Sequence, residues 1–279
     1  MKKNREMRSV RVSEPSESHL DSISAPDSTI DAIRAFWEEY VYDDVKVAQH
    51  PIDTKDFFDE LEAYRSERLE YLPRIVDFAA YKGKRVLEVG CRVGIDLVRF
   101  ARHGADVTGI DLLDSCVESA RTNFALHGLT GDLQTMNGEQ LEFDDESFDM
   151  VYAHGVVQYT EDPERMIREI GRVLKPGGEA ILMVYNRYSW LNVLSRVSGK
   201  NLEHEDSPVF KKYSISEFRR ALSDFSQVRM IPERFPVRTR LHSGLKARLY
   251  YRVFVGLFNL IPRPIVRPFG SHIIGKAIR

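Results

Sequence analysis

Between residues 85 and 186, short apolar runs alternate with longer stretches in which apolar residues recur at helical spacing. The clearest run, residues 86–89, reads Val-Leu-Glu-Val and is followed by helical spacing over residues 97–101. Short apolar runs are typical of parallel strands that are covered on both faces, and their alternation with helices indicates βαβ units. The pattern therefore predicts an α/β protein built around a parallel sheet.

Two amphipathic helices are predicted ahead of this core. The first starts near Ser28, a candidate N-cap, and extends to Tyr40, while the second starts near Thr54 and extends to Leu72. Residues 1–27 mix basic residues with serine, proline and acids and have no periodic apolar pattern. We expect a disordered tail there.

A glycine turn joins the first apolar run to the helix that follows it. Gly90 and Gly94 flank this turn, and glycine permits positive φ and a close approach of the backbone to a ligand. The next predicted strand ends in Asp111, about twenty residues after the glycines, where nucleotide-binding sheets carry a ribose-binding carboxylate. Because parallel strands end at the same edge of a sheet, these residues predict a nucleotide site at that edge.

Glu88, two residues before the first glycine, distinguishes this turn from a dinucleotide fingerprint, which does not usually place an acid there. With it, the sequence resembles the class I S-adenosylmethionine-dependent methyltransferases, in particular the small-molecule branch that includes the ubiquinone and menaquinone biosynthesis methyltransferases. The resemblance covers residues 84–186. The ordered motifs that carry it are residues 87–94, 109–111, 137–143, 147–152 and 172–178.

The resemblance implies a Rossmann-like, seven-stranded mixed sheet with additions at both ends. Residues 28–83 would form N-terminal lid helices and residues 84–186 the S-adenosylmethionine-binding core. Residues 187–279 would supply an acceptor-side insertion, a basic amphipathic helix and the edge hairpin, whose last strand is residues 272–278. The implied cofactor is S-adenosylmethionine, with S-adenosylhomocysteine as product. The implied cofactor-binding residues are Glu88, Gly90, Cys91, Arg92, Gly94, Asp111, Leu112, Asn137, Gly138, Glu139 and His154.

Arg92 departs from the family pattern, which usually has glycine at this position. If the turn needs positive φ here, a non-glycine residue strains it by about 1 kcal/mol or more. Three interpretations stay open: a tolerated surface arginine, a clamp for a carboxylate of cofactor or substrate, and a side chain that closes the cofactor pocket.

The acceptor side is predicted around the end of the fourth strand. His154 is the candidate general base because an imidazole titrates near neutral pH, and Tyr159 is the second catalytic candidate. A purely structural role for His154 is equally open, since methyl transfer needs little beyond proximity and alignment. The candidate substrate contacts, each of which has packing as an alternative role, are Trp37, Tyr40, Phe58, Tyr64, Arg65, Gln158, Tyr185 and Arg187.

Composition narrows the class of protein. The chain has 279 residues and a formal charge of −2, so no overall basic field indicates nucleic-acid binding. Its two cysteines, Cys91 and Cys116, indicate a reduced compartment and have no metal-ligand spacing, and the charged patch at 203–206 lacks the spacing of a metal site. Without a signal peptide or a membrane-spanning run, we expect a cytoplasmic protein; monomer and homodimer both stay open.

A basic, apolar segment at residues 245–261 is the last predicted feature. We favour a cap over the pocket; docking on an anionic membrane surface and a dimer interface are the alternatives. The predicted function is methyl transfer to an oxygen, nitrogen or sulfur atom of a small molecule. The alternatives are a modified cofactor or non-methyl chemistry through Arg92, and a catalytically silent scaffold.

Overall fold

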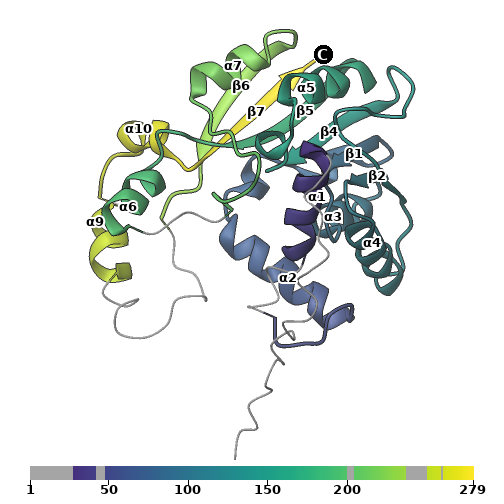
Figure 1. Ribbon diagram of the computed structural model, residues 1–279, viewed down its shortest axis with the longest axis horizontal. Coiled ribbons are helices and arrows are strands. Elements are labelled where there is room, and N and C mark those ends of the chain that lie inside the picture. The colour runs from purple at the N-terminus through teal and green to yellow at the C-terminus, as the bar shows by residue number, and fades with distance from the viewer. Residues whose placement is uncertain (1–27, 42–47, 200–203, 237–249, 259) are drawn as a thin grey trace, which may run out of the picture.

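The computed structural model describes residues 28–41, 48–199, 204–236, 250–258 and 260–279. The predicted tail at 1–27 lies outside the described residues. The described residues form a three-layer arrangement in which helices cover both faces of one sheet (Figure 1).

The sheet has seven strands in the order β3-β2-β1-β4-β5-β7-β6. All pairs from β3 to β5 are parallel, whereas β7 runs antiparallel between β5 and β6. This is the mixed sheet with an antiparallel edge that the sequence predicted. The strands are β1 (Arg85–Val89), β2 (Asp106–Asp111), β3 (Asp132–Thr135), β4 (Phe148–His154), β5 (Leu174–Tyr185), β6 (Ser226–Glu233) and β7 (His272–Ile278).

Successive residues of a strand point to opposite faces, and the two faces bury separate cores. Leu87 and Val89 of β1 pack with residues of α5 and α7, whereas Val86 packs with residues of α3 and α4. Figure 1 shows α5 and α7 on one side of the sheet and α1 to α4 on the other. The main helices are α1 (Thr29–Glu39), α2 (Lys55–Arg68), α3 (Ile95–Arg102), α4 (Asp114–Leu126), α5 (Pro163–Val173), α6 (Trp190–Ser198) and α7 (Ile215–Ala221).

The two N-terminal helices begin where the capping residues predicted. Ser28 Oγ accepts from the backbone N–H of Asp31, and Thr54 Oγ1 accepts from that of Phe57. The second helix ends at Arg68, short of the predicted Leu72, and a 3-10 helix follows at Leu72–Arg74. Leu69, the C-cap, has φ −117° and ψ 47°, outside the helical region, so the helix ends there.

The C-terminal additions lie beside the β6–β7 edge of the sheet. Short helices follow α6 there: a π-helix (Tyr250–Val255), α9 (Gly256–Phe258), α10 (Arg263–Val266) and a 3-10 helix (Arg267–Phe269). The Trp190 and Phe258 rings, whose centroids are 6.1 Å apart, join α6 to α9. No helix among the described residues has the length and apolar character needed to cross a membrane.

Candidate active site

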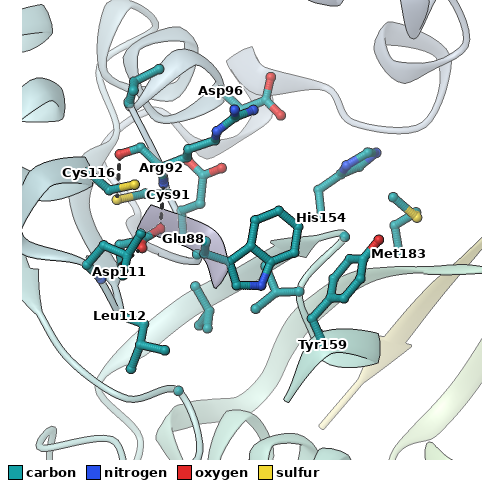
Figure 2. Close-up of a pocket in the computed structure, with 18 of the residues that line it drawn as sticks. Glu88, Cys91, Arg92, Asp96, Asp111, Leu112, Cys116, His154, Tyr159 and Met183 are labelled. Atoms are coloured by element: carbon teal, nitrogen blue, oxygen red, sulfur yellow. Dashed lines mark hydrogen bonds between the residues drawn. The ribbon is translucent and has the colours of Figure 1, made fainter. Parts of the chain in front are cut away.

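A cavity of about 290 Å³ opens at the carboxyl ends of β1, β2, β4 and β5. Helices α1 and α2 form its outer wall; α2 contributes Leu61, Tyr64, Arg65 and Arg68, which share one helical face. Figure 2 shows Glu88 and Asp111 on one side of this cavity and His154 and Tyr159 on the other. We call these two sides the cofactor end and the acceptor end.

The glycine turn after β1 brings backbone close to the cavity. Gly90 has φ 73°, and a Cβ at this position would lie 2.3 Å from Cγ2 of Val156, so no other residue fits without a shift. The backbone N–H groups of Gly90 and Cys91 both donate to the carbonyl of Ile110, at 2.8 and 2.9 Å. These two amides are therefore used inside the protein, and charged side chains dominate the recognition chemistry of the cofactor end.

Asp111 is fixed by two backbone donors at the end of β2. Oδ2 accepts from the N–H of Arg92 at 2.8 Å, and Oδ1 accepts from the N–H of Leu113 at 3.1 Å. Burial raises the pKa of Asp111, and these hydrogen bonds act in the opposite direction. A carboxylate oxygen accepts two hydrogen bonds, so each oxygen retains capacity for a hydroxyl donor.

Glu88 lies deeper, at 4% exposure, and its Oε2 has no hydrogen-bond partner. Burial and the negative charge of Asp96 raise its pKa well above the usual value. An unpartnered buried carboxyl costs free energy that a cationic ligand would recover. The cofactor end therefore offers one site for a cation and one for hydroxyl donors.

Arg92 adopts φ 52°, the positive value that the glycine-rich turn suggested. Its guanidinium donates to the carbonyls of Tyr40, at 2.6 Å, and Val41, at 3.2 Å. Tyr40 is the C-cap of α1, so Arg92 connects the turn after β1 to the end of the first helix. Both of these partners are main-chain carbonyls.

A buried ion pair separates the two ends of the cavity. Arg65 of α2 pairs with Asp96 of α3, and Asp96 also accepts from the Tyr152 hydroxyl at 2.9 Å. Although burial alone would raise it, the Arg65 charge lowers the pKa of Asp96 to about 2. This pair fixes α2 against the sheet.

His154 lies in a chain of ring hydrogen bonds at the acceptor end. Tyr71 Oη is 3.1 Å from Nε2 of His154 and 2.6 Å from Nδ1 of His272. Nε2 of His272 is in turn 2.8 Å from a guanidinium nitrogen of Arg234. Burial and nearby arginine charges lower the pKa of His154 to about 3, so its imidazole is neutral near pH 7.

Aromatic rings complete the acceptor end. The Trp37 ring packs edge-on against Tyr159 at 4.8 Å, and the His204 ring lies 4.9 Å from Trp37 and 4.8 Å from Tyr40. Tyr185 lies 5.2 Å from His272. Such a wall excludes water from the acceptor side.

Comparison with known proteins agrees with this geometry. A protein-family model described as a methyltransferase domain matches residues 87–182. The sheet order, the turn and Asp111 all fall within or beside that match. Residues 87–182 are thus similar to a methyltransferase domain, and the sheet has the Rossmann-like fold of methyltransferases.

Two relatives of this methyltransferase domain are ubiquinone biosynthesis O-methyltransferases. The one from Coxiella burnetii is 33% identical over 120 residues, which are 43% of this chain and 50% of the relative. The one from Xanthomonas oryzae pv. oryzae is 39% identical over 132 residues, 46% of this chain and 52% of the relative. The chain thus spans about half the length of the curated relatives it matches.

Solved structures with the same fold cover most of the chain. A methyltransferase from Thermotoga maritima, described as a possible histamine N-methyltransferase, has TM-score 0.57 and 17% identity, covering 88% of this chain and 98% of that one. The magnesium protoporphyrin IX methyltransferase of Synechocystis, solved with S-adenosylhomocysteine bound, has TM-score 0.56 and 16% identity at the same coverage. At these identities the likeness establishes the fold of the methyltransferase domain.

Most predicted site residues line this cavity. Those from the cofactor prediction are Glu88, Gly90, Cys91, Arg92, Asp111, Leu112, Asn137, Gly138 and His154. Those from the acceptor prediction are Trp37, Tyr40, Tyr64, Arg65, Tyr159 and Tyr185. Gly94 is not among the lining residues; it is the left-handed N-cap of α3, with φ 76°.

Four predicted contacts lie elsewhere. Phe58 is one helical turn before Leu61 on α2, beyond the edge of the cavity, and is buried in a core cluster. Glu139 accepts from Thr160 Oγ1 and from the N–H of Glu161, which ties two loops together. Gln158 is fully buried behind the wall, and Arg187 pairs with Glu217 at 2.9 Å on the surface. Packing thus explains the position of Phe58, hydrogen bonding that of Glu139 and ion pairing that of Arg187, whereas the buried amide of Gln158 has no hydrogen-bond partner among the described residues.

The predicted C-terminal cap is not formed by its described part. Residues 245–249 and 259 and the side chains of residues 250, 251, 254 and 257 lie outside the described part. The remaining residues of the segment, which do not line the cavity, are Arg252, Val253, Val255, Gly256, Phe258, Leu260 and Ile261. The described residues also contain no group of three or more His, Cys, Asp or Glu placed to hold a metal ion.

The sequence analysis did not identify several residues that line the cavity. They are Arg68, Asp96, Met183, His204, Arg234 and His272. Arg234 follows β6 and His272 begins β7, far from any cofactor motif. The one available signal was the absence of acids after Glu233, which marked this region as basic without placing it at the cavity.

Proposed function

We propose that this chain transfers a methyl group from S-adenosylmethionine to an oxygen, nitrogen or sulfur atom of a small molecule. The observation that carries the proposal is the pair of carboxyl groups, Glu88 (buried) and Asp111 (half-buried), at the ends of adjacent strands. Glu88 has an unpartnered oxygen for a cationic amino group, and Asp111 has open lone pairs for two ribose hydroxyls. These donors and acceptors match the polar groups of S-adenosylmethionine.

The adenine would lie between the loops after β2 and β3. Leu112 and Gly138 line the cavity there, and a Cβ on Gly138 would lie 2.7 Å from Met166 and 2.8 Å from Val89. Asn137 Oδ1 accepts from the N–H of Glu139 at 2.9 Å, so its NH₂ group is the part that can donate to a ring nitrogen.

When bound, S-adenosylmethionine supplies a methyl group on an electrophilic sulfonium. The residues of the acceptor end then have to hold the acceptor in line with that methyl and exclude water, which is the larger part of the catalytic advantage. Trp37 and Tyr64 come from α1 and α2, which would act as a lid over this end. Tyr159 and Tyr185 would hold the acceptor against the sheet.

We assign His154 a positioning role in place of the general base that the sequence suggested. Its pKa of about 3 makes it a weak base, and Nε2 lies within hydrogen-bond distance of the Tyr71 hydroxyl. We favour methyl transfer over the two alternatives that depended on Arg92, because its guanidinium bonds to the carbonyls of Tyr40 and Val41.

Calorimetric titration with S-adenosylhomocysteine tests this proposal directly. Each hydrogen bond from a hydroxyl to a charged carboxylate is worth about 1.5–3 kcal/mol, so Asp111→Asn should weaken binding by about a hundredfold or more. Asp106→Asn, at the opposite end of the same strand, should leave affinity unchanged. A wild-type protein that binds neither S-adenosylmethionine nor S-adenosylhomocysteine refutes the proposed function.

A further inference from the structure

Arg234 is held on the cavity wall in a conformation that costs free energy. It has φ 61°, in the left-handed region, where a non-glycine residue is strained. Three groups donate to its carbonyl: Trp190 Nε1 at 3.0 Å, Ser271 Oγ at 3.1 Å and the N–H of Ser271 at 3.2 Å. The surroundings thus fix this strained backbone, and the guanidinium lines the acceptor end.

The partners of Arg234 determine the direction of the whole hydrogen-bond chain. A guanidinium only donates, so Nε2 of His272, 2.8 Å away, is the acceptor and carries no proton. Nδ1 of His272 then holds the ring proton and donates to Tyr71 Oη, and the Tyr71 hydroxyl donates to Nε2 of His154. Each of these hydrogen bonds therefore has one donor and one acceptor when both imidazoles are neutral.

In the described part of the chain, no ionised acid is paired with Arg234. Burial lowers the pKa of His272 well below its usual value and raises that of Tyr71, so neither ionises near pH 7. Among the described residues no carboxylate forms an ion pair with Arg234: Asp96 pairs with Arg65, and Glu233 lies 3.9 Å from Arg74. The sequence after Glu233 contains no acid at all.

Arg234 is half-buried, and one of its five N–H donors reaches His272. Its guanidinium is suited to a planar anion, which it binds through two parallel hydrogen bonds. Arg68 lines the same cavity and adds a second positive charge near His272. An aromatic wall continues from His272 to Tyr185 at 5.2 Å and from Tyr185 to Tyr159 at 6.4 Å. The anion subsite and the flat apolar wall are therefore contiguous.

We propose that the methyl acceptor is an anion with a flat apolar body, whose carboxylate or phosphate group binds Arg234 while the body lies along Tyr185 and Tyr159. This inference rests on the proposed methyl transfer, since it names the acceptor class for the same cavity. It assigns Arg234 as a specificity-determining residue at the end of the cavity opposite Glu88 and Asp111.

The test uses the full chain saturated with S-adenosylhomocysteine and a set of matched probes in calorimetry. The set pairs 4-hydroxybenzoate and 6-hydroxy-2-naphthoate with their carboxamides, and phenyl phosphate with phenol, so that each pair differs in charge. We expect at least one anion to bind about tenfold more tightly than its neutral partner. Arg234→Met should abolish that advantage and leave the neutral probes unaffected.

Arg229→Met is the matched control, because Arg229 is an exposed arginine of β6 that does not line the cavity. It should retain the full preference for anions. Unchanged affinity of Arg234→Met for S-adenosylhomocysteine will show that the variant is folded. The assignment is overturned if neutral and anionic probes bind alike, if the preference survives in Arg234→Met, or if none of the anions binds.

Failure of the methyltransferase proposal gives a different result. If wild-type protein does not bind S-adenosylhomocysteine, the same probes are titrated into the unloaded protein. A preference for anions that Arg234→Met removes would then preserve the anion subsite without the cofactor.

Discussion

Substitution of Arg92 should release the first helix without unfolding the sheet. The guanidinium donates two hydrogen bonds to Tyr40 and Val41 at the C-terminal end of α1, where the helix dipole also favours a cation. Hydrogen bonds that involve a charged group contribute about 1.5–3 kcal/mol each. Arg92→Gly loses both bonds, but it recovers about 1 kcal/mol of strain at φ 52°.

The strain stays in the turn whether α1 is closed or open, so with the lower value for each bond the loss for α1 is about 3 kcal/mol, which corresponds to a factor of about 150 in local opening. Amide hydrogen exchange of residues 29–40, followed by mass spectrometry, measures this opening. Exchange in β1 and β4 should be unaltered, because the Arg92 N–H still donates to Asp111 in the variant.

Arg92→Ala separates the two contributions. It loses the same bonds but keeps the strained turn, so α1 should open as readily as in Arg92→Gly, while the global free energy of unfolding should be about 1 kcal/mol lower. Wild-type exchange rates in α1 for both variants would refute the reasoning, since the guanidinium would then contribute nothing to the lid.

Two further predictions concern pH. Burial and Asp96 raise the pKa of Glu88, and a cationic ligand binds its ionised form. Affinity for S-adenosylhomocysteine should therefore rise with pH through that raised pKa. Calorimetry of Glu88→Gln should give a flat profile, whereas an equal slope in both proteins would contradict the argument. His154 has a folded-state pKa of about 3 and an unfolded value near 6.5, so the unfolded chain binds the extra proton and stability falls as pH drops through that window. The free energy of unfolding falls by about 1.4 kcal/mol per pH unit in that window, and the lowered pKa of His272 acts in the same direction. In urea unfolding, the free energy of unfolding of His154→Gln should depend less steeply on pH than that of the wild type. The exposed control His103→Gln should not show this shallower slope.

The cofactor end was predictable because its residues lie close together in the sequence and on strands with strong patterns. Apolar runs predicted the bounds of β1 and β2 to within a residue. In a parallel sheet the carboxyl ends of neighbouring strands lie at the same edge. Their positions in the sequence were therefore enough to predict that Gly90, Glu88 and Asp111 lie together at one edge of the sheet.

The acceptor end was harder because distant segments build it. His272 is aligned with Tyr185 of β5 and Glu233 of β6 through the antiparallel register of β7. No periodicity in the sequence encodes that register, and a single-residue shift would turn His272 to the opposite face. Arg234 reaches the cavity for the same reason, since it follows directly on β6.

The cavity has opposite charge at its two ends, and this bears on how the two ligands would bind. Glu88 and Asp111 favour a cation at the cofactor end, whereas Arg234 leaves a positive charge at the acceptor end. The ion pair between Arg65 and Asp96 lies between them and contributes little net charge. A cationic cofactor and an anionic acceptor would each be attracted to one end and repelled from the other, because charges interact strongly where water is excluded. The asymmetry would therefore fix the orientation of both ligands before any methyl group moves, which is the alignment that methyl transfer needs.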